Sequence, residues 1–367
     1  MPSESVEGKP GGSGDRKVPR EEVREISVIL VSWKDAEELA GAVESLAAAR
    51  ERVPPGGPRV SLFVVDNGGA LDGDLLRSLW PVASLSVNPA NRGFGPAANQ
   101  AAGLAAGDVL FFVNPDARAE GDLFTEIARG FRTHPEAVAL APRLLDLDEN
   151  LEGRNPKSEI VPRPLAPPGR EDQFTFQLRR LPGLLSDARE LLLFDHVAPD
   201  NASRRRFRYA DSDRGAPFEV EQAAAAALAV RAGVFARVGG FDESFAPAWF
   251  EDVDLCRRLL AEGRILYWPE ARLRHRGNAS AGVLGYPRFL PIYYGNALRY
   301  RRLHYSLPAR LLYRPLLAAG MLLRLSALPF RPSPPRPRKE SARAYLRVLS
   351  LALGLKSPIT NHQSQIP

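Results

Sequence analysis

The sequence has little cysteine and no apolar segment near its start. The single cysteine, Cys256, excludes an internal disulfide framework and any zinc site built from several cysteines. Such low cysteine use suits a reducing compartment. Residues 1–25 lack the apolar core of a signal peptide, and we expect them to form a disordered, polar tail. With 44% hydrophobic residues in a chain of 367, the remainder has the composition of a globular protein.

Acidic residues are almost missing from the last quarter of the chain. Residues 281–367 hold 14 of the 49 lysines and arginines but one of the 43 acids, a net charge of +13 against −7 elsewhere. Arginines alternate there with apolar runs, which predicts an amphipathic segment on an anionic membrane surface. Arg314 and Arg324 interrupt the apolar run, so we expect it to be too short to span a membrane. The alternative is a set of helices that cover the body of this chain or of a partner.

Short apolar runs alternate with amphipathic helical patterns before residue 144. Strands are predicted at 26–31, 60–65, 85–87, 109–113 and 138–140. Helices are predicted at 36–50, 71–80, 96–106 and 123–133. The alternation predicts a doubly wound α/β sheet.

Residues 144–218 differ, because they are rich in proline, arginine and aspartate and show weak periodicity. We interpret them as a variable region lying over the sheet. Regular patterning returns at 220–230, followed by a predicted helix at 252–262 and a strand at 265–268. Residues 331–338 are predicted to be extended and residues 341–355 to form a last helix.

An acid follows the apolar strand 109–113, in the sequence Asn114-Pro115-Asp116. Ligands of open α/β sheets gather at the carboxyl ends of strands, where a carboxylate can hold a divalent cation against a diphosphate. The alternative is that Asp116 merely caps the following turn.

A glycine-containing segment, 91–99, opens a predicted helix. Glycines allow the backbone to approach a ligand closely, and a helix N-terminus favours anions. The spacing Gly93-x-Gly95-x-x-Ala98 fits a dinucleotide fingerprint only loosely, because no strand leads directly into Gly93. Nicotinamide binding is therefore not expected.

A second acidic group, Glu251, Asp252 and Asp254, stands at the start of a helix. Acids there suit the helix dipole without any chemistry. However, Trp249 and Phe250 precede them, and an aromatic wall beside a carboxylate can hold a sugar ring next to a general base. His275, after the strand 265–268, is either structural or a ligand for a metal or diphosphate.

Taken in order, these segments resemble a family 2 glycosyltransferase with the GT-A fold, of the rhamnosyltransferase-like branch. The resemblance covers roughly 26–303 and includes Ser32-Trp33, Asp66-Asn67-Gly68, the 91–99 segment, Asn114-Pro115-Asp116, Gly239 to Glu243, Glu251 to Cys256 and His275. It implies a mixed, mainly parallel sheet flanked by helices, at 26–280, followed by the helical basic extension 281–367.

The resemblance also implies roles for individual residues. It places Asp252 as the catalytic base and Asp116 and His275 as ligands of Mg²⁺ or Mn²⁺. It places Trp249 and Glu251 at the acceptor. The residues implied for nucleotide-sugar binding are Val31, Trp33, Asp66, Arg92, Gly93, Asn99 and Asn114. Transfer would then be one inverting displacement, with the cation neutralising the departing diphosphate and one base taking the acceptor's proton.

The sequence therefore predicts an inverting, metal-dependent glycosyltransferase at the cytoplasmic face of the cell membrane. Its donor would be a dTDP- or UDP-sugar, with dTDP-rhamnose the first choice, and its acceptor a glycan or polyprenyl-linked precursor. The chain departs from the family at 223–227, which has no glycine, so the sugar stays open. One alternative is a non-catalytic scaffold that binds nucleotide-sugar or glycan. Another is a nucleic-acid-binding tail, for which Tyr293, Tyr294, Tyr300, Tyr305 and Tyr313 would be the stacking side chains.

Overall fold

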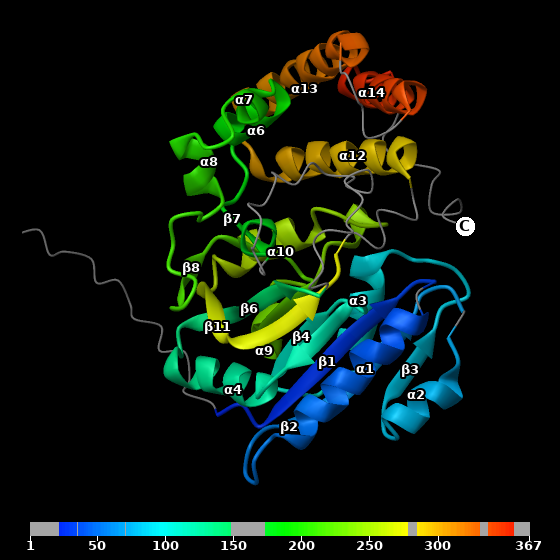
Figure 1. The fold of residues 1–367 in the computed structure, drawn as a ribbon, viewed down its shortest axis with the longest axis vertical. Helices are drawn as coiled ribbons and strands as arrows, with labels where there is room; N and C mark the ends of the chain where they lie inside the picture. Colours follow the sequence, from blue (N-terminus) through cyan, green and yellow to red (C-terminus); the bar gives the residue numbers. More distant parts are fainter. Residues whose placement is uncertain are drawn as a thin grey trace, which may run out of the picture.

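A nine-stranded mixed sheet forms the body of the protein (Figure 1). The computed structural model describes residues 22–34, 36–69, 71–147, 173–277, 285–330 and 337–355. The strand order is β3-β2-β1-β4-β10-β6-β11-β5, with β8 also paired to β11. The strands are β1 (Glu25–Ser32), β2 (Arg59–Asp66), β3 (Ser84–Val87), β4 (Val109–Val113), β5 (Ala117–Glu120), β6 (Ala137–Asp146), β8 (Phe218–Val220), β10 (Ala227–Arg231) and β11 (Arg264–His275).

Six of these strands run in one direction, so their carboxyl ends lie at one edge of the sheet. β1, β2, β3 and β4 pair in parallel, and antiparallel β10 then connects them to β6 and β11. The edge therefore collects the segments that follow Ser32, Asp66, Val113, Asp146 and His275. The predicted mixed, mainly parallel sheet is confirmed.

Helices cover both faces of the sheet, each with its own apolar core. One core holds α1 (Ala36–Glu51), α2 (Gly73–Leu79) and α4 (Leu123–Thr133) against the sheet. The other holds α3 (Phe94–Ala102), α9 (Ala232–Arg237) and α10 (Glu251–Leu259). Because the central strands β1 and β4 are apolar and buried on both faces, both sides of the sheet need cover, as alternating β and α segments predict.

Most element predictions are confirmed, but several boundaries are wrong. The predicted tail 1–25 reaches too far, because Val23 is buried and Glu25 begins β1; residues 1–21 lie outside the described residues. β6 continues to Asp146 and β11 to His275, so His275 ends a strand rather than following one. β5 was not predicted, since its sequence Ala-Arg-Ala-Glu carries no strand pattern.

The described part of the variable region, from Gln173 onward, contains short helices that its weak periodicity did not predict. These are α5 (Phe174–Gln177), α6 (Leu184–Leu191), α7 (Phe194–Val197) and α8 (Ala202–Phe207). β7 (Leu178–Arg179) pairs with β9 (Gln222–Ala223) in a separate two-stranded sheet. Only part of this region lies over the main sheet, since α6 packs instead on the C-terminal helix α13 (Leu307–Ala327).

Three C-terminal helices form a further layer, seen above the sheet in Figure 1. α12 (Tyr286–His304) and α13 pack with α14 (Arg338–Ala352) around a third apolar core, which also takes in Leu191, Phe245 and Phe250. The predicted last helix is confirmed as α14, whereas residues 331–336 of the predicted extended stretch lie outside the described residues. Tyr294, Tyr300 and Tyr313 are buried in this core, which removes most of the stacking surface that the nucleic-acid alternative requires.

α13 continues through Arg314 and Arg324 without a break. With the short turn η4 (Leu328–Phe330) it forms the one described helix that is long and apolar enough to cross a membrane by length and composition, at 24 residues and a mean hydropathy of 1.4. The prediction that the arginines leave it too short is therefore wrong. Length alone does not distinguish a span from a packed helix, and α13 packs on α6 and α14.

Candidate active site

Four polar side chains meet where β4, β6 and β11 end, and we call them the strand-end cluster: Asn114, Asp116, Gln173 and His275. His275 Nε2 lies 3.1 Å from Asp116 Oδ1 and 3.2 Å from Asn114 Nδ2. His275 Nδ1 lies 2.8 Å from Gln173 Oε1, and Gln173 Nε2 donates to Asp146. The structure thus brings together Asn114, Asp116 and His275, which lie up to 161 positions apart in the sequence.

The cluster suits a divalent cation. Because the Gln173 amide nitrogen is used by Asp146, its oxygen faces His275, and Nδ1 of the imidazole carries the proton. Nε2 then faces a buried Asp116 oxygen at 3.1 Å and the Asn114 amide nitrogen at 3.2 Å. A positive charge between Nε2 and the carboxylate, carried by a proton or by a bound cation, would make this arrangement favourable. Gln173 fixes the orientation of the His275 ring, as a metal-binding histidine requires.

Asp116 is kept ionised at this position. It is 3% exposed, and burial alone would raise its pKa. The hydrogen bond and charge of His275 and the Gly277 N–H, which donates to Oδ2 at 3.0 Å, outweigh burial, so the pKa of Asp116 is lowered. No group of three or more His, Cys, Asp or Glu side chains suited to a metal occurs in the described ranges. A cation here would have to complete its ligands with substrate phosphate and water, as Mg²⁺ commonly does.

The residues predicted to hold the nucleotide base lie along the same edge. Val31 is the next-to-last residue of β1 and Asp66 the last of the paired strand β2. The Trp33 ring lies against Gly68, whose added Cβ would be 3.2 Å away. Both carboxylate oxygens of Asp66 accept backbone N–H groups, from Gly69 at 3.0 Å and Leu71 at 2.7 Å. The observed role of Asp66 is therefore to shape the turn after β2, and its role in base binding stays a prediction.

Asn67 organises this edge, although the sequence analysis gave it no role. Its Nδ2 donates to Asn91 Oδ1 at 2.8 Å, and its Oδ1 accepts from Asn88 Nδ2 and the Arg92 N–H at 3.1 and 3.0 Å. The side chain of Arg92 is exposed and donates to Gln100 at 3.2 Å. Asn67 therefore holds the segment that leads into Gly93.

The glycine-containing segment packs on the 241–247 loop of the protein itself. Gly93 has φ +91°, and an added Cβ would lie 2.9 Å from the Pro247 backbone. The Asn99 side chain accepts from the Phe241 N–H at 2.9 Å and donates to the Phe241 carbonyl at 2.9 Å. Gly93 and Asn99 thus clamp the 241–247 loop to α3, and their contact with a nucleotide-sugar stays a prediction.

Glu251 and Asp252 begin α10, and we call them the helix-start cluster. Two residues in the left-handed conformation precede them, Trp249 at φ +74° and Phe250 at φ +75°. This conformation costs a bulky residue roughly 1–3 kcal/mol, so the surrounding structure must hold it. The strained turn sets where the two acids stand.

The electrostatics of this pair favour proton uptake. Burial, and then the charge of Asp252, raise the pKa of Glu251, whose Oε2 has no hydrogen-bond partner among the described residues. Burial also raises the pKa of Asp252, although the Val253 N–H, at 2.8 Å, and the charge of Arg179 oppose it. A carboxylate with a raised pKa is a better general base.

α12 holds the strained turn from the C-terminal layer. Asn296 Nδ2 lies within hydrogen-bond distance of three carbonyl oxygens, those of Phe245 at 2.6 Å, Ala248 at 2.9 Å and Trp249 at 3.0 Å. Phe250 is buried against Tyr293 and Tyr300, so it is not part of an exposed aromatic wall. Trp249 is half-buried with its ring edge-on to Phe289, and its contact with the acceptor stays a prediction.

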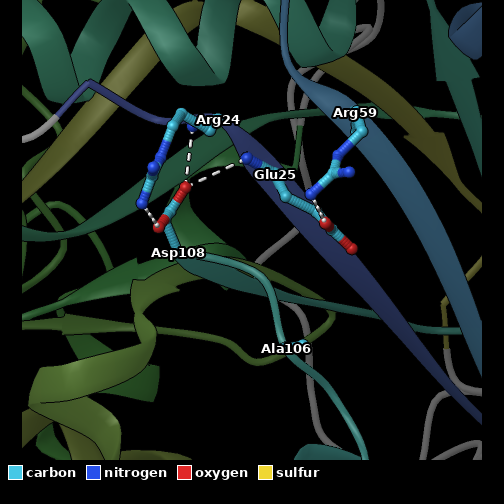
Figure 2. Close-up of a pocket in the computed structure, with 5 residues that line it drawn as sticks. All are labelled: Arg24, Glu25, Arg59, Ala106 and Asp108. Carbon is cyan, nitrogen blue, oxygen red and sulfur yellow. Dashed lines mark hydrogen bonds and ion pairs between the residues drawn. The ribbon is translucent and has the colours of Figure 1, made fainter.

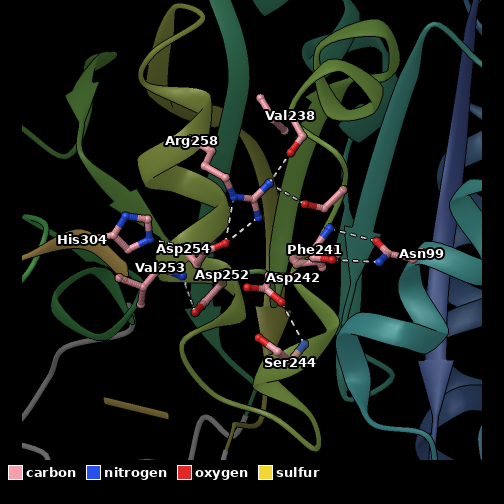
Figure 3. A network of polar contacts seen from close by, with 11 residues as sticks. Asn99, Val238, Phe241, Asp242, Ser244, Asp252, Val253, Asp254, Arg258 and His304 are labelled. Carbon is pink, nitrogen blue, oxygen red and sulfur yellow. Dashed lines mark hydrogen bonds and ion pairs between the residues drawn. The ribbon is translucent and has the colours of Figure 1, made fainter. Parts of the chain in front are cut away.

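Asp254 serves a different purpose from its neighbour Asp252. Figure 3 shows its carboxylate between Arg258 and His304, at 2.6 Å from a nitrogen of each. His304 belongs to α12, so this ion pair fastens α10 to the C-terminal layer. Asp252 accepts from the adjacent Val253 N–H at 2.8 Å and from the Ala225 backbone, and it takes no part in the contacts of Asp254.

The two clusters are linked through one short segment. The Asn114 N–H donates to the Ala226 carbonyl at 3.0 Å, and the Ala225 backbone hydrogen-bonds Asp252. Residues 224–226 thus separate the end of β4 from the start of α10.

A cavity in the described residues lies away from both clusters. It has about 400 Å³ and sits at the amino end of β1, lined by Arg24, Glu25, Arg59, Ala106 and Asp108 (Figure 2). Its charges are already paired, Arg59 with Glu25 at 2.8 Å and Arg24 with Asp108 at 3.9 Å. It has no group left for catalysis.

Comparisons with known proteins found a family profile and a curated relative. The profile of the family described as Glycosyl transferase family 2 matches residues 27–206. N-acetylglucosaminyl-diphospho-decaprenol L-rhamnosyltransferase of Mycobacterium tuberculosis is 27% identical over 273 residues, which cover 70% of this chain and 78% of that protein. The profile match includes Asp66, Asn114 and Asp116 but ends before the helix-start cluster.

Solved structures give weaker likenesses. The mannosyltransferase PcManGT from Pyrobaculum calidifontis, in complex with GDP-Man and Mn²⁺, aligns at a TM-score of 0.47 and 12% identity, over 92% of this chain and 87% of that one. S. aureus TarS 1–349 aligns at 0.44 and 13% identity, over 90% and 92%. Since both TM-scores are below 0.5, the fold rests on the strand order and the family match.

Proposed function

Because this chain is a family 2 glycosyltransferase, similar to a rhamnosyltransferase, we propose that it moves a sugar from a nucleotide-sugar to a lipid-linked glycan acceptor. The observation that carries this proposal is the placement of an ionised acid–imidazole pair and a raised-pKa carboxylate on either side of residues 224–226. Transfer from a nucleotide-sugar needs these two functions. One neutralises a leaving diphosphate and the other accepts a proton.

Asp116 and His275, with Asn114 beside them, would hold Mg²⁺ or Mn²⁺. The bound ion would neutralise the diphosphate of the donor. Asp252 takes the proton of the acceptor hydroxyl as that oxygen attacks the anomeric carbon, and the nucleoside diphosphate leaves from the opposite face. One displacement inverts the anomeric centre. We propose dTDP-rhamnose as donor and a polyprenyl-diphosphate glycan as acceptor, supported by the name of the mycobacterial relative.

We further propose that the enzyme works as a peripheral protein at the cytoplasmic face of the cell membrane. Exposed apolar side chains on α13 and η4 support this: Leu307, Leu311, Leu312, Leu322, Leu323 and Phe330. Arg314 on α13 and Arg343 and Arg347 on α14 are also exposed. Apolar side chains with arginines around them suit an anionic bilayer surface.

Nucleotide binding with and without metal tests the proposal. We expect dTDP or UDP species to raise the melting temperature with Mn²⁺ but not with chelator, because a ligand that binds only the native state stabilises it. Asp116→Asn should lose this metal-dependent shift, whereas Asp122→Asn, before α4, should keep it. A shift that is equal with Mn²⁺ and with chelator would contradict the metal assignment. A nucleotide shift without any sugar transfer would favour the scaffold alternative.

A further inference from the structure

Two arginines of the variable region, Arg179 and Arg208, lie close together, and neither forms a salt bridge with a carboxylate of the described residues. The Arg180 N–H donates to the Phe207 carbonyl at 2.8 Å. Arg179 precedes Arg180 and Arg208 follows Phe207, so this bond brings the two arginines close together. Arg208 ends α8, where its N–H lies 3.1 Å from the Arg204 carbonyl, one helical turn earlier. Arg204 is 8% exposed and joins the same group. We call Arg179, Arg204 and Arg208 the arginine cluster.

The arginines next in sequence, Arg180 and Arg205, do form salt bridges with carboxylates. Arg180 pairs with Glu221 at 2.7 Å, and Arg205 pairs with Asp211. The side chain of Arg179 contacts only the Phe176 ring, 5.8 Å from its centroid, and its Nε is buried without a hydrogen-bond partner among the described residues. Arg204 donates to the carbonyls of Asp195 and Pro199 rather than to a carboxylate.

The positive charge of the arginine cluster is not fully neutralised by the nearby carboxylates. Burial, and then the charges of Arg179 and Arg204, lower the pKa of Arg208 to about 9, against the opposing effect of Glu190 and Asp195. Like charges gathered away from water are unfavourable in the protein alone. Such a group becomes favourable when an anion with several oxygen acceptors binds it, and arginines are well suited to phosphate.

The position of the cluster connects it to the helix-start cluster. β7, which contains Arg179, pairs with β9, and the Ala223 N–H of β9 donates to Cys256 Sγ of α10 at 3.5 Å. The charge of Arg179 acts on Asp252 and on Tyr293 of α12. By contrast, the groups that act on Asp116 are His275 and the backbone around it. The arginines therefore lie on the side of the proposed base, away from the proposed metal ligands.

We propose that Arg179, Arg204 and Arg208 bind the diphosphate that joins the acceptor glycan to its lipid, an inference that rests on the proposed function. The acceptor hydroxyl must reach Asp252, so the rest of the acceptor has to lie next to the base. Through α6 the variable region also packs on α13, whose exposed leucines would contact the membrane. A lipid diphosphate bound at the arginine cluster would have its chain directed to that surface and its sugar to Asp252.

The test measures binding of geranyl diphosphate and geranyl monophosphate by calorimetry, without nucleotide or metal. The native protein should prefer the diphosphate, and Arg179→Gln and Arg208→Gln should each weaken its binding about 10-fold or more, as expected for lost charge-assisted hydrogen bonds. The control is Arg206→Gln, an exposed arginine on α8, which should bind as the native protein does. Unchanged binding in both cluster variants would overturn the proposal.

Kinetics and stability separate the remaining explanations. In the transfer assay the cluster variants should raise KM for a lipid-diphosphate acceptor about 10-fold or more and leave donor KM unchanged. A rise in donor KM alone would overturn the proposal and assign the cluster to the donor diphosphate. A structural role predicts a lower melting temperature for Arg208→Gln, whereas removing an unpaired charge should maintain or raise it. If geranyl diphosphate binds through the arginines but no transfer occurs with any donor, the proposed function fails and the anion site stands.

Discussion

The two sides of the candidate site differ in how their polar groups are satisfied. In the strand-end cluster, His275, Gln173 and Asp116 each bond to one another or to backbone. On the side of the helix-start cluster, Glu251 and Arg179 have buried polar atoms without hydrogen-bond partners in the described part of the chain. A buried polar group left without a partner costs about 1–3 kcal/mol. The polar groups of the strand-end cluster thus have their hydrogen bonds without a substrate. On the other side, Glu251 and Arg179 have polar atoms that a substrate could hydrogen-bond.

The largest expected effect would come from the base itself. Asp252→Asn should lower kcat by about 100- to 10,000-fold, because the acceptor proton then has no base. Nucleotide affinity should remain unchanged, since it depends on the strand-end cluster. Steady-state kinetics with calorimetric nucleotide binding measures both. If Glu251→Gln abolishes transfer and Asp252→Asn does not, Glu251 is the base.

The second prediction concerns the membrane face on the same side of the molecule. Replacing Leu311 and Leu322 of α13 by glutamate should weaken binding to anionic vesicles by about 100-fold or more, since each leucine buried in the bilayer contributes about 1.5–3 kcal/mol and the two together about 3–6 kcal/mol. Leu104→Glu is the control, because Leu104 is also 56% exposed but lies after α3. Vesicle sedimentation provides the measurement. Equal sedimentation of all three proteins would place the membrane contact elsewhere.

Point changes are preferable here to removing the C-terminal layer. A truncation after Ser280 would also remove the packing partners of Phe245 and Phe250 and the hydrogen bonds of Asn296. A loss of vesicle binding could then result either from losing the membrane face or from disrupting the strained turn before α10.

The third prediction tests whether the C-terminal layer supports the active site. Asn296→Ala removes the donor to three loop carbonyls, and at about 1 kcal/mol for each bond the free energy of unfolding should fall by roughly 2–4 kcal/mol. The kcat should fall about 10-fold because Asp252 loses its position, while nucleotide binding stays the same. Arg299→Ala, at an exposed position on α12, is the control for both readouts. Unchanged kcat in a folded Asn296→Ala protein would show that the turn keeps its conformation without α12.

The smallest effect concerns the pH dependence of stability. Burial raises the pKa of Glu251, so the folded protein binds a proton that the unfolded chain releases above its ordinary pKa of about 4.3. Native stability should therefore fall as pH rises from there through the folded pKa. The raised pKa of Asp252 contributes a slope of the same sign, so Glu251→Gln should reduce the slope rather than remove it. This variant should be more stable than the native protein at pH 7.5, with the difference vanishing near pH 4. Urea unfolding across this range measures it, with the exposed Glu44→Gln as control. A native protein without this slope would contradict the raised pKa.

Local patterns in the sequence identified the strands and helices of the sheet and the acids that follow them. β4 was placed without error because five consecutive apolar residues end at an asparagine–proline pair, and Asp116 was noted for the same reason. The order of such motifs along the chain also identified the family. These features depend on neighbours in sequence, and each can be seen within about ten residues.

Contacts between distant segments were decided only by the tertiary structure. Gln173 bonds to His275, 102 positions away, and it lies in a region without periodicity, so no local signal indicated it. Asn296 and His304 looked like part of a membrane-binding tail, yet they hold the turn and the helix that carry Asp252. The sequence pattern records which face of an element is apolar, but not which element that face will meet. The roles of the amide, imidazole and guanidinium groups depend on which distant residues they contact in the folded protein.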